Sequence, residues 1–227
     1  MSLRITSTPA VRAGALWLAA SLVYLVTEAI TAIGFPHYSY ATNFISDLGI
    51  PERGSFEGRP IDSTLAWVMN TGFVVHGLLF LLATVFFTRS KTSKHRNWLI
   101  PLAAIHTVGI IMVGLIHGSA ITAANGMLLY HGLGAALAIF GGNIAIIIGG
   151  FVARKLGASR IYLLMSIVIP VVGMVSAIIL FVTRPDSPLP QGWMERASVY
   201  SIMLWEIITA VALFASRKKM STAIASH

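Results

Sequence analysis

The 227-residue chain contains no cysteine and few charged residues. Without cysteine, disulfides, thiolate catalysis and zinc or iron–sulfur sites with cysteine ligands are excluded. Charged residues make up 11% of the chain, whereas a typical soluble domain carries about 25%. Hydrophobic residues account for 56%, and the mean hydropathy is +0.80. This composition predicts a polytopic integral membrane protein.

Six apolar runs are long enough to cross a bilayer as helices, which takes roughly 20 residues each. They lie at about 13–35, 64–87, 98–118, 127–152, 162–182 and 198–215. The N-terminus is not typical of a cleavable signal, because the first run carries Glu28 and is too long. We therefore expect an all-α fold, in which residues 1–227 form a single six-helix transmembrane bundle with one long external loop at 36–63.

Positively charged residues are distributed unevenly between the two sides of this bundle. Twelve lysines and arginines fall in the N-terminal segment, the second and fourth loops and the C-terminal tail, against four on the other side. Because cytoplasmic segments are enriched in Lys and Arg, both termini are predicted to lie in the cytoplasm, at a prokaryotic plasma membrane. The formal net charge of +8 comes from these short clusters. It indicates membrane topology, and we expect no nucleic-acid partner.

The stretch from Phe35 to Gly49, FPHYSYATNFISDLG, places titratable and aromatic side chains directly after the first span. Ser46 and Asp47 can cap a short helix or turn, since both side chains accept backbone N–H bonds. Asp47 can also act as a base or hold a metal. No GxSxG motif is present, so an ordinary serine hydrolase is not indicated. The candidate catalytic residues are Asp47, His37 and His131, and the candidate ligand-binding residues of this stretch are Tyr38, Asn43 and Ser46.

Ionisable side chains also occur inside the spans, where a charge at the bilayer centre costs roughly 2.5–3.5 kcal/mol on insertion scales. Glu28 in the first run and Glu206 in the last are predicted to lie at similar depth, in the outer half. Each carboxyl is either protonated and hydrogen-bonded to a neighbouring helix or part of a ligand or proton site. His76 and His106 lie near the middle of the second and third runs. We add these two histidines, both glutamates and Asn70 to the candidate ligand-binding residues.

A metal site at the outer surface is a further hypothesis. Asp47, His117 and His131 are predicted near that surface, and His and Asp are ligands that zinc accepts. No closely spaced pair such as HExxH is present, and a bundle histidine bonded to a carbonyl or carboxylate is the alternative. His76 and His106 form the mid-bilayer pair that a haem would need. The sequence leaves the cofactor unknown.

Small residues recur at four-residue spacing in the fourth span, at Gly134, Ala138 and Gly142. Such spacing lets helix backbones approach closely, so it predicts tight packing within the bundle. Pro170 is expected to bend the fifth span near its centre, which can open space for a ligand.

The segment HYSYATNFISDLG at 37–49 resembles a family of bacterial and archaeal six-span membrane proteins, domain of unknown function 998. Gly109 and Gly114 in the third span and the His131-Gly132 start of the fourth span add to this resemblance. The ISDLG core is also distantly similar to an element of the eukaryotic autophagy-modulator and GPI-lipid-remodelling membrane families. These resemblances imply a six-helix bundle in or near lipid metabolism, without a settled reaction.

Three classes of function are compatible with this sequence, and a small proton-coupled carrier that uses Glu28 and Glu206 ranks below them. The first is a binding protein with an outer-leaflet polar pocket for a lipid or isoprenoid-type ligand. The second is a hydrolase or transferase, metal-dependent in one version, that acts on a lipid head group through His and Asp. The third is an accessory subunit of an envelope complex. The expected partners are membrane lipids, with a homo-oligomer or a larger membrane complex as the possible assembly.

Overall fold

The computed structural model describes residues 7–89, 96–183, 187 and 189–225. Within them, six helices are long and apolar enough to cross a membrane, which makes the chain a multi-pass membrane protein. These helices are α1 (Thr8–Ile33), α2 (Ala66–Thr88), α3 (Arg96–Leu115), α5 (Leu128–Lys155), α6 (Arg160–Val182) and α7 (Gln191–Ala225). The shorter elements are the 3₁₀ turn η1 (Ser46–Gly49), strands β1 (Gly54–Phe56) and β2 (Arg59–Ile61), and α4 (Ala120–Ala124).

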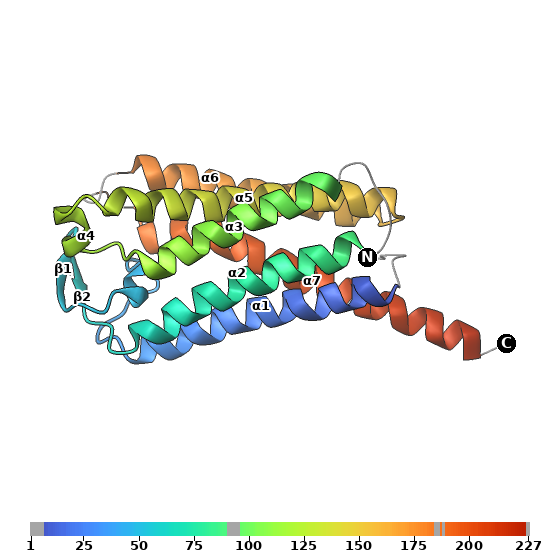
Figure 1. Ribbon diagram of the computed structural model, residues 1–227, viewed down its shortest axis with the longest axis horizontal. Coiled ribbons are helices and arrows are strands. Elements are labelled where there is room, and N and C mark those ends of the chain that lie inside the picture. The colour runs from blue at the N-terminus through green and yellow to red at the C-terminus, as the bar shows by residue number, and fades with distance from the viewer. Residues whose placement is uncertain (1–6, 90–95, 184–186, 188, 226–227) are drawn as a thin grey trace.

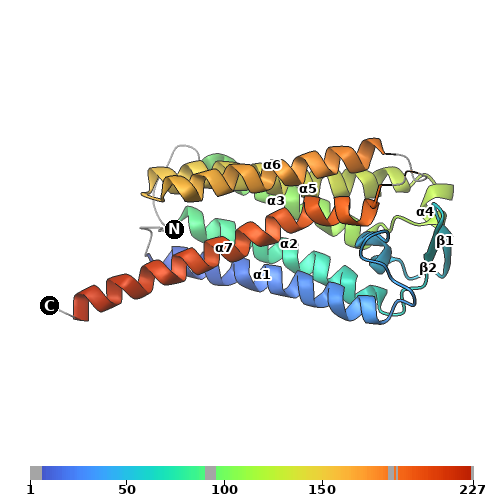
Figure 2. The same ribbon diagram turned by 180° about the vertical axis from the view of Figure 1, so that it is seen from behind.

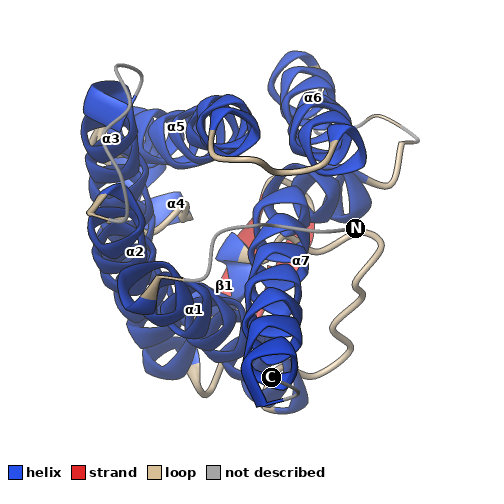
Figure 3. Cartoon of the chain, turned by 90° about the vertical axis from the view of Figure 1, so that its right-hand side faces the viewer, coloured by secondary structure: helices blue, strands red, loops and turns tan. Residues whose placement is uncertain are grey.

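The long helices form a closed ring in which each packs against its neighbours in sequence, and α7 returns to α1. Figure 3 shows this arrangement end-on, with α1, α2 and α3 along one side and α5, α6 and α7 completing the bundle. Helix α7 also contacts α5. The six predicted spans are therefore present, and the all-helical class is confirmed apart from one short hairpin.

The two ends of the bundle differ. Helix α1 begins and α7 ends at one end, which we call the terminal end, and α7 extends beyond the other helices there (Figures 1 and 2). The 3₁₀ turn, the hairpin and α4 lie at the opposite end, the loop end (Figure 1). Both ends of the described chain therefore lie on one side of the bundle.

The loop between α1 and α2 is largely ordered into local structure. Strands β1 and β2 pair in antiparallel register, with Phe56 opposite Arg59. The two residues between them, Glu57 and Gly58, both have positive φ, at 48° and 77°. A two-residue turn with positive φ at both positions matches the twist of paired strands, which explains why the chain reverses here.

Small residues set the closest helix contact, as the spacing in the fourth span predicts. A Cβ added at Gly109 on α3 would lie 2.3 Å from the Ala138 backbone N and 2.6 Å from the Gly134 carbonyl O on α5. The backbones of α3 and α5 therefore touch without intervening side chains.

Helix α7 begins at Gln191, seven residues before the predicted span at 198. Its first turns contain the polar residues Glu195 and Arg196, which low hydropathy placed outside that span. Arg196 is nevertheless only 5% exposed, because its charge is paired with Glu28 inside the bundle.

Candidate functional site

Arg196, near the start of α7, ties the loop after α1 to both helices. Its Nε donates to Oε1 of Glu28 on α1 at 3.1 Å, and its Nη2 donates to the Tyr38 hydroxyl. Three backbone carbonyls accept from its Nη1 at 2.8, 2.9 and 3.1 Å, those of Tyr40, Asn43 and Gly192. The guanidinium also lies 4.7 Å from the centre of the Tyr40 ring. One cation therefore bonds to three polar groups of residues 38–43, the Tyr38 hydroxyl and the carbonyls of Tyr40 and Asn43.

Glu28 and Tyr38, both candidate ligand-binding residues, belong to this network. The Oε2 atom of Glu28 accepts from the Tyr200 hydroxyl at 2.7 Å, so Arg196 and Tyr200 occupy both carboxylate oxygens. Tyr38 donates to the Phe44 carbonyl at 3.0 Å. Burial raises the pKa of Tyr38 well above its ordinary value, so its hydroxyl stays neutral. These two side chains hold the loop against α1 and α7.

Asp47 is buried and paired with Arg59 of the hairpin. The Arg59 Nε lies 2.9 Å from Oδ2 and its Nη2 lies 3.3 Å from Oδ1, which is a bidentate arrangement. Oδ2 also accepts from the Phe44 backbone N–H at 2.9 Å and from Asn43 Nδ2 at 3.4 Å. The Arg59 guanidinium stacks 4.1 Å from the Phe44 ring centre. Asp47 therefore holds the segment before η1 and the hairpin together, mainly through its ion pair with Arg59.

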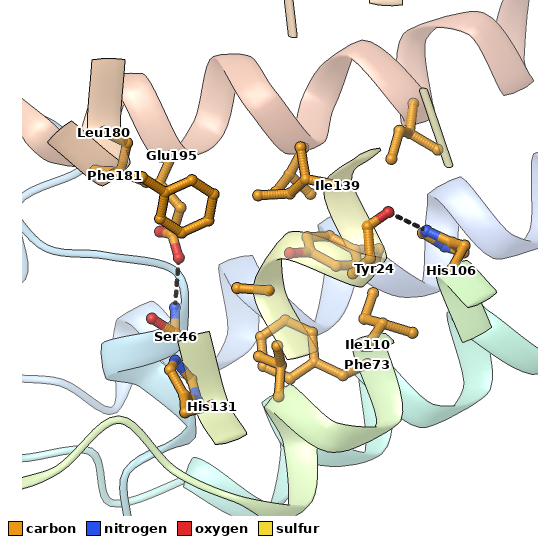
Figure 4. A pocket seen from close by; sticks show the side chains of 15 residues that line it. Tyr24, Ser46, Phe73, His106, Ile110, His131, Ile139, Leu180, Phe181 and Glu195 are labelled. Carbon is orange, nitrogen blue, oxygen red and sulfur yellow. Dashed lines mark hydrogen bonds between the residues drawn. The ribbon is translucent and has the colours of Figure 1, made fainter. Parts of the chain in front are cut away.

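Glu195 reaches from α7 to the start of η1. Its Oε2 accepts from the Ile45 backbone N–H and its Oε1 from that of Ser46 at 3.3 Å. Figure 4 shows the second of these bonds, with the carboxylate above Ser46. A carboxylate suits the first N–H groups of a helical turn, because they have no partner within the turn. Helix α7 thus fixes η1 by a side-chain cap.

A cavity of about 60 Å³ lies directly below this cap, inside the bundle. Four of its lining residues are polar groups from the candidate list or the cap: Ser46, His106, His131 and Glu195. The others are mainly apolar or aromatic and come from all six long helices: Tyr24, Phe73, Ile110, Val113, Ala135, Ala138, Ile139, Leu180, Phe181, Val199 and Ile202. Figure 4 shows Ser46, Glu195 and His131 at one side of the cavity and His106 at the other.

The other loop-end candidates are bonded to the backbone or to each other. His131 donates from Nδ1 to the Ile116 carbonyl at 2.6 Å. Asn70 donates to the Gly49 carbonyl at 2.9 Å, and its Nδ2 lies 3.1 Å from Nε2 of His117. These contacts fasten η1 and the end of α3 to their neighbours, as expected of bundle histidines.

Asp47, His117 and His131 do not assemble into the metal site considered above. Across residues 7–89, 96–183, 187 and 189–225, no group of three or more His, Asp or Glu side chains is placed to hold an ion. One physical reason is that the guanidinium of Arg59 occupies the Asp47 carboxylate in a bidentate pair.

The three candidate catalytic residues are likewise not joined to one another. His37 is exposed and has a positive φ of 59°. Among the described residues, no hydrogen bond links it to Asp47 or His131. The assignment of catalysis to these side chains stays a prediction.

A second group of candidates meets near the middle of the bundle. His76 on α2 and His106 on α3 contact edge to face, with ring centres 5.4 Å apart, and Glu206 on α7 lies beside His76. His106 donates from Nδ1 to the Ala138 carbonyl at 2.7 Å (Figure 4). An edge-to-face contact leaves no space for a porphyrin plane between the two rings, so the pair does not fit a haem.

Sequence reasoning missed three residues on which this region depends: Arg59, Glu195 and Arg196. One sequence feature could have indicated two of them: Glu195 and Arg196 are neighbours of opposite charge, directly before an apolar span, in a chain with few charges. A charge drawn into a span needs a partner inside the protein.

Comparison with known proteins places this architecture in a family. No curated protein and no solved structure matches the chain. One family description, Protein of unknown function (DUF998), matches residues 18–212, which include all of η1, the hairpin and most of α1 and α7. The more distant resemblance to autophagy-modulator and GPI-lipid-remodelling families stays a prediction. The chain belongs to the DUF998 family of membrane proteins.

Proposed function

We propose that this protein binds a lipid or isoprenoid-type molecule, with the apolar chain in the central cavity and a neutral, hydroxyl-bearing head near η1. The observation that carries this proposal is the cavity itself. It is bounded by side chains from every long helix, and its lining is apolar except at its ends. Binding sites for small molecules commonly combine an apolar lining with a few placed polar groups.

The polar groups near η1 favour a neutral head over a phosphate. Because His131 donates from Nδ1 to a carbonyl, its Nε2 in the neutral ring is an acceptor. The Ser46 hydroxyl, which lines the cavity, can donate or accept. Glu195 presents carboxyl oxygens that accept backbone N–H bonds, and Arg59 and Arg196 are already paired with Asp47 and Glu28. An anionic head would therefore meet a carboxyl group, and none of the described residues that line the cavity is a cation.

Lateral access from the membrane is supported by the position of α6. Its residues Leu180 and Phe181 line the cavity, while Phe181 is 46% exposed on the outside of the bundle. Phe181 stacks on Phe140 of α5, with ring centres 6.4 Å apart and 28° between the planes. These two rings, at the boundary of α5 and α6, separate the cavity from the bilayer and would have to move apart to admit a ligand.

The size of the cavity sets a condition on this mechanism. A volume of about 60 Å³ is smaller than a cavity that holds benzene, which is about 150 Å³. A ligand chain therefore needs α6 to move away from α5 and α7. Helix α6 is suited to this, because only 28% of its most apolar stretch is buried, and Pro170 interrupts its hydrogen bonding.

We place the loop end on the outside of a prokaryotic plasma membrane, with both termini cytoplasmic. The uneven distribution of Lys and Arg supports this orientation. Helices α1 and α7 bring the two termini to one side of the bundle, as that distribution requires. The cavity then lies at the level of the outer leaflet.

The test is to identify lipids that stay with the protein after gentle extraction, by native mass spectrometry. We expect one retained lipid or isoprenoid per chain. Ala135→Leu, which adds bulk to a cavity-lining position of α5, should reduce retention about tenfold. Gly132→Leu is the matched control, because a Cβ added there meets nothing within 4 Å. Absence of a stoichiometric lipid, or equal retention by both variants, would overturn the proposal.

The head-group preference is tested by competition with two ligands that share one chain. An isoprenoid alcohol should displace the bound molecule, and its monophosphate should not. If the monophosphate competes equally, the neutral-head assignment is wrong, even where a lipid is bound.

A further inference from the structure

Ser21, His76 and Glu206 form a polar contact between three helices, in the middle of the bundle. The Ser21 Oγ donates to Glu206 Oε2 at 2.5 Å, and His76 Nε2 lies 3.4 Å from the same oxygen. All three side chains are 0% exposed. Helix α7 is thereby joined to α1 and α2 through a single carboxylate oxygen.

Three polar atoms of this centre have no hydrogen-bond partner among the described residues. They are Oε1 of Glu206, Nδ1 of His76 and Nε2 of the adjacent His106. Buried polar atoms are normally satisfied, and each exception needs an explanation. Here all three belong to groups that can gain or lose a proton.

Among the described residues, His76 is the ion-pair partner of Glu206, and no lysine or arginine pairs with it. The side chains that face the centre are Ser21 and Tyr24 from α1, His76 from α2 and His106 from α3. Nearby on α7, Asn143 of α5 bonds to Ser201, and Tyr162 of α6 bonds to Thr209. Arg196 precedes Glu206 by ten residues, which is about 15 Å along a helix, and it is paired with Glu28. An ionised Glu206 beside a neutral His76 would leave a net negative charge in the membrane interior.

We propose that Glu206, His76 and Ser21, with His106 beside them, form a buried proton-binding site. In the empty state, neutral His76 donates from Nε2–H to Glu206 Oε2, and its Nδ1 carries a lone pair. A hydronium ion that enters through the adjoining cavity transfers its proton to Nδ1, which gives an imidazolium opposite the carboxylate and leaves a neutral water. The net charge of the centre changes from −1 to zero, and no covalent bond within the protein breaks.

The path for this proton leads to the loop end. His106 contacts His76 and also lines the cavity below η1. Toward the terminal end lie aromatic rings and a smaller cavity of about 10 Å³: Phe80 lies 4.6 Å from His106, and beyond it Trp17 packs on Phe87 and Trp205. The cavity below η1 is the larger of the two, so we assign proton exchange to the loop end. This inference does not depend on lipid binding.

The direct test is nitrogen NMR of histidine-labelled protein in lipid bilayers, between about pH 4 and about pH 9, which brackets ordinary imidazole and carboxyl pKa values. His76→Gln identifies the His76 signals by their loss. We expect the wild-type His76 ring to change from the doubly protonated to the Nε2–H form within this range. A ring that stays neutral throughout would overturn the proposal.

Glu206→Gln tests the role of the carboxylate on the same signal. It should move the His76 titration midpoint to lower pH by at least about one unit, a tenfold loss in proton affinity. An unchanged midpoint would show that the carboxylate does not hold the proton. The wild-type measurement stands by itself if this variant does not fold.

The path is tested by hydrogen–deuterium exchange at the His76 ring. Ala135→Leu should slow this exchange without shifting the titration midpoint, and Gly132→Leu should leave both unchanged. Equal exchange rates in the two variants would overturn access through the cavity.

Discussion

Glu28 on α1 and Arg196 on α7 form a buried ion pair across 168 residues of sequence, with Arg196 Nη2 3.0 Å from Glu28 Oε1. Breaking a buried pair leaves one charge without compensation, which typically costs about 3–5 kcal/mol. We therefore expect Arg196→Ala to lower the free energy of unfolding by about that amount. Unfolding in a denaturing detergent, followed by circular dichroism, measures the change.

Arg196→Lys and the double variant Glu28→Gln/Arg196→Met complete this comparison. Lysine has three donors on one nitrogen and cannot reach the acceptors that the planar guanidinium joins, so it should rescue little stability. The double variant removes both charges and should be more stable than Arg196→Ala. A double variant as unstable as Arg196→Ala would show that the lost carbonyl contacts, and not the unpaired Glu28, dominate.

Asp47→Asn tests the structural role of Asp47. The substitution removes the bidentate Arg59 pair and weakens the cap on Phe44, so residues 43–61 should open more easily, by about 1–3 kcal/mol. Hydrogen exchange of backbone amides should rise there and stay unchanged in α3 and α5. Asp62→Asn is the control: its partner Arg53 is 72% exposed, and such surface pairs contribute about 0–1 kcal/mol.

Gly109→Ala tests the direct backbone contact of α3 with α5. The new methyl group would lie 2.3 Å from a backbone nitrogen, so the helices must separate, at a cost of about 1–3 kcal/mol. Gly132→Ala on α5 meets open space and should stabilise by up to about 1 kcal/mol, because alanine favours helix. Thermal unfolding in nanodiscs compares them. Equal destabilisation by both substitutions would contradict the contact.

The absence of cysteine allows a direct measurement of orientation. Thr8→Cys lies at the terminal end and Ser55→Cys in the hairpin, and both positions are exposed. In intact cells, a membrane-impermeant maleimide should label Cys at 55 and reach Cys at 8 only after permeabilisation. The reverse pattern would place the loop end in the cytoplasm.

Much of the fold follows from local sequence. Apolar runs predicted the six helices, since a membrane span needs only length and low charge, and Gly134, Ala138 and Gly142 predicted close packing. Helix α7 begins before the predicted span, because hydropathy counts Glu195 and Arg196 as polar without regard to partners. Partners on other helices cannot be read from one segment.

The candidate site was predictable in part. The sequence marked the stretch at 35–49 as unusual, and Ser46 from it lines one cavity with His106 and His131. The metal site at Asp47 was not formed, because Arg59 of the hairpin occupies that carboxylate. The position of Arg59 depends on the turn at Glu57-Gly58, which orients its side chain toward η1.

The sequence by itself determined a six-span membrane protein and marked Phe35–Gly49 and the buried Glu and His residues as exceptional, because composition and spacing are local properties. Only the tertiary structure decided that Arg196 binds Glu28, that Glu195 caps η1 and that His76 meets Glu206. The physical reason is that each pairing depends on the rotation and depth of whole helices, and packing of the entire ring sets these together.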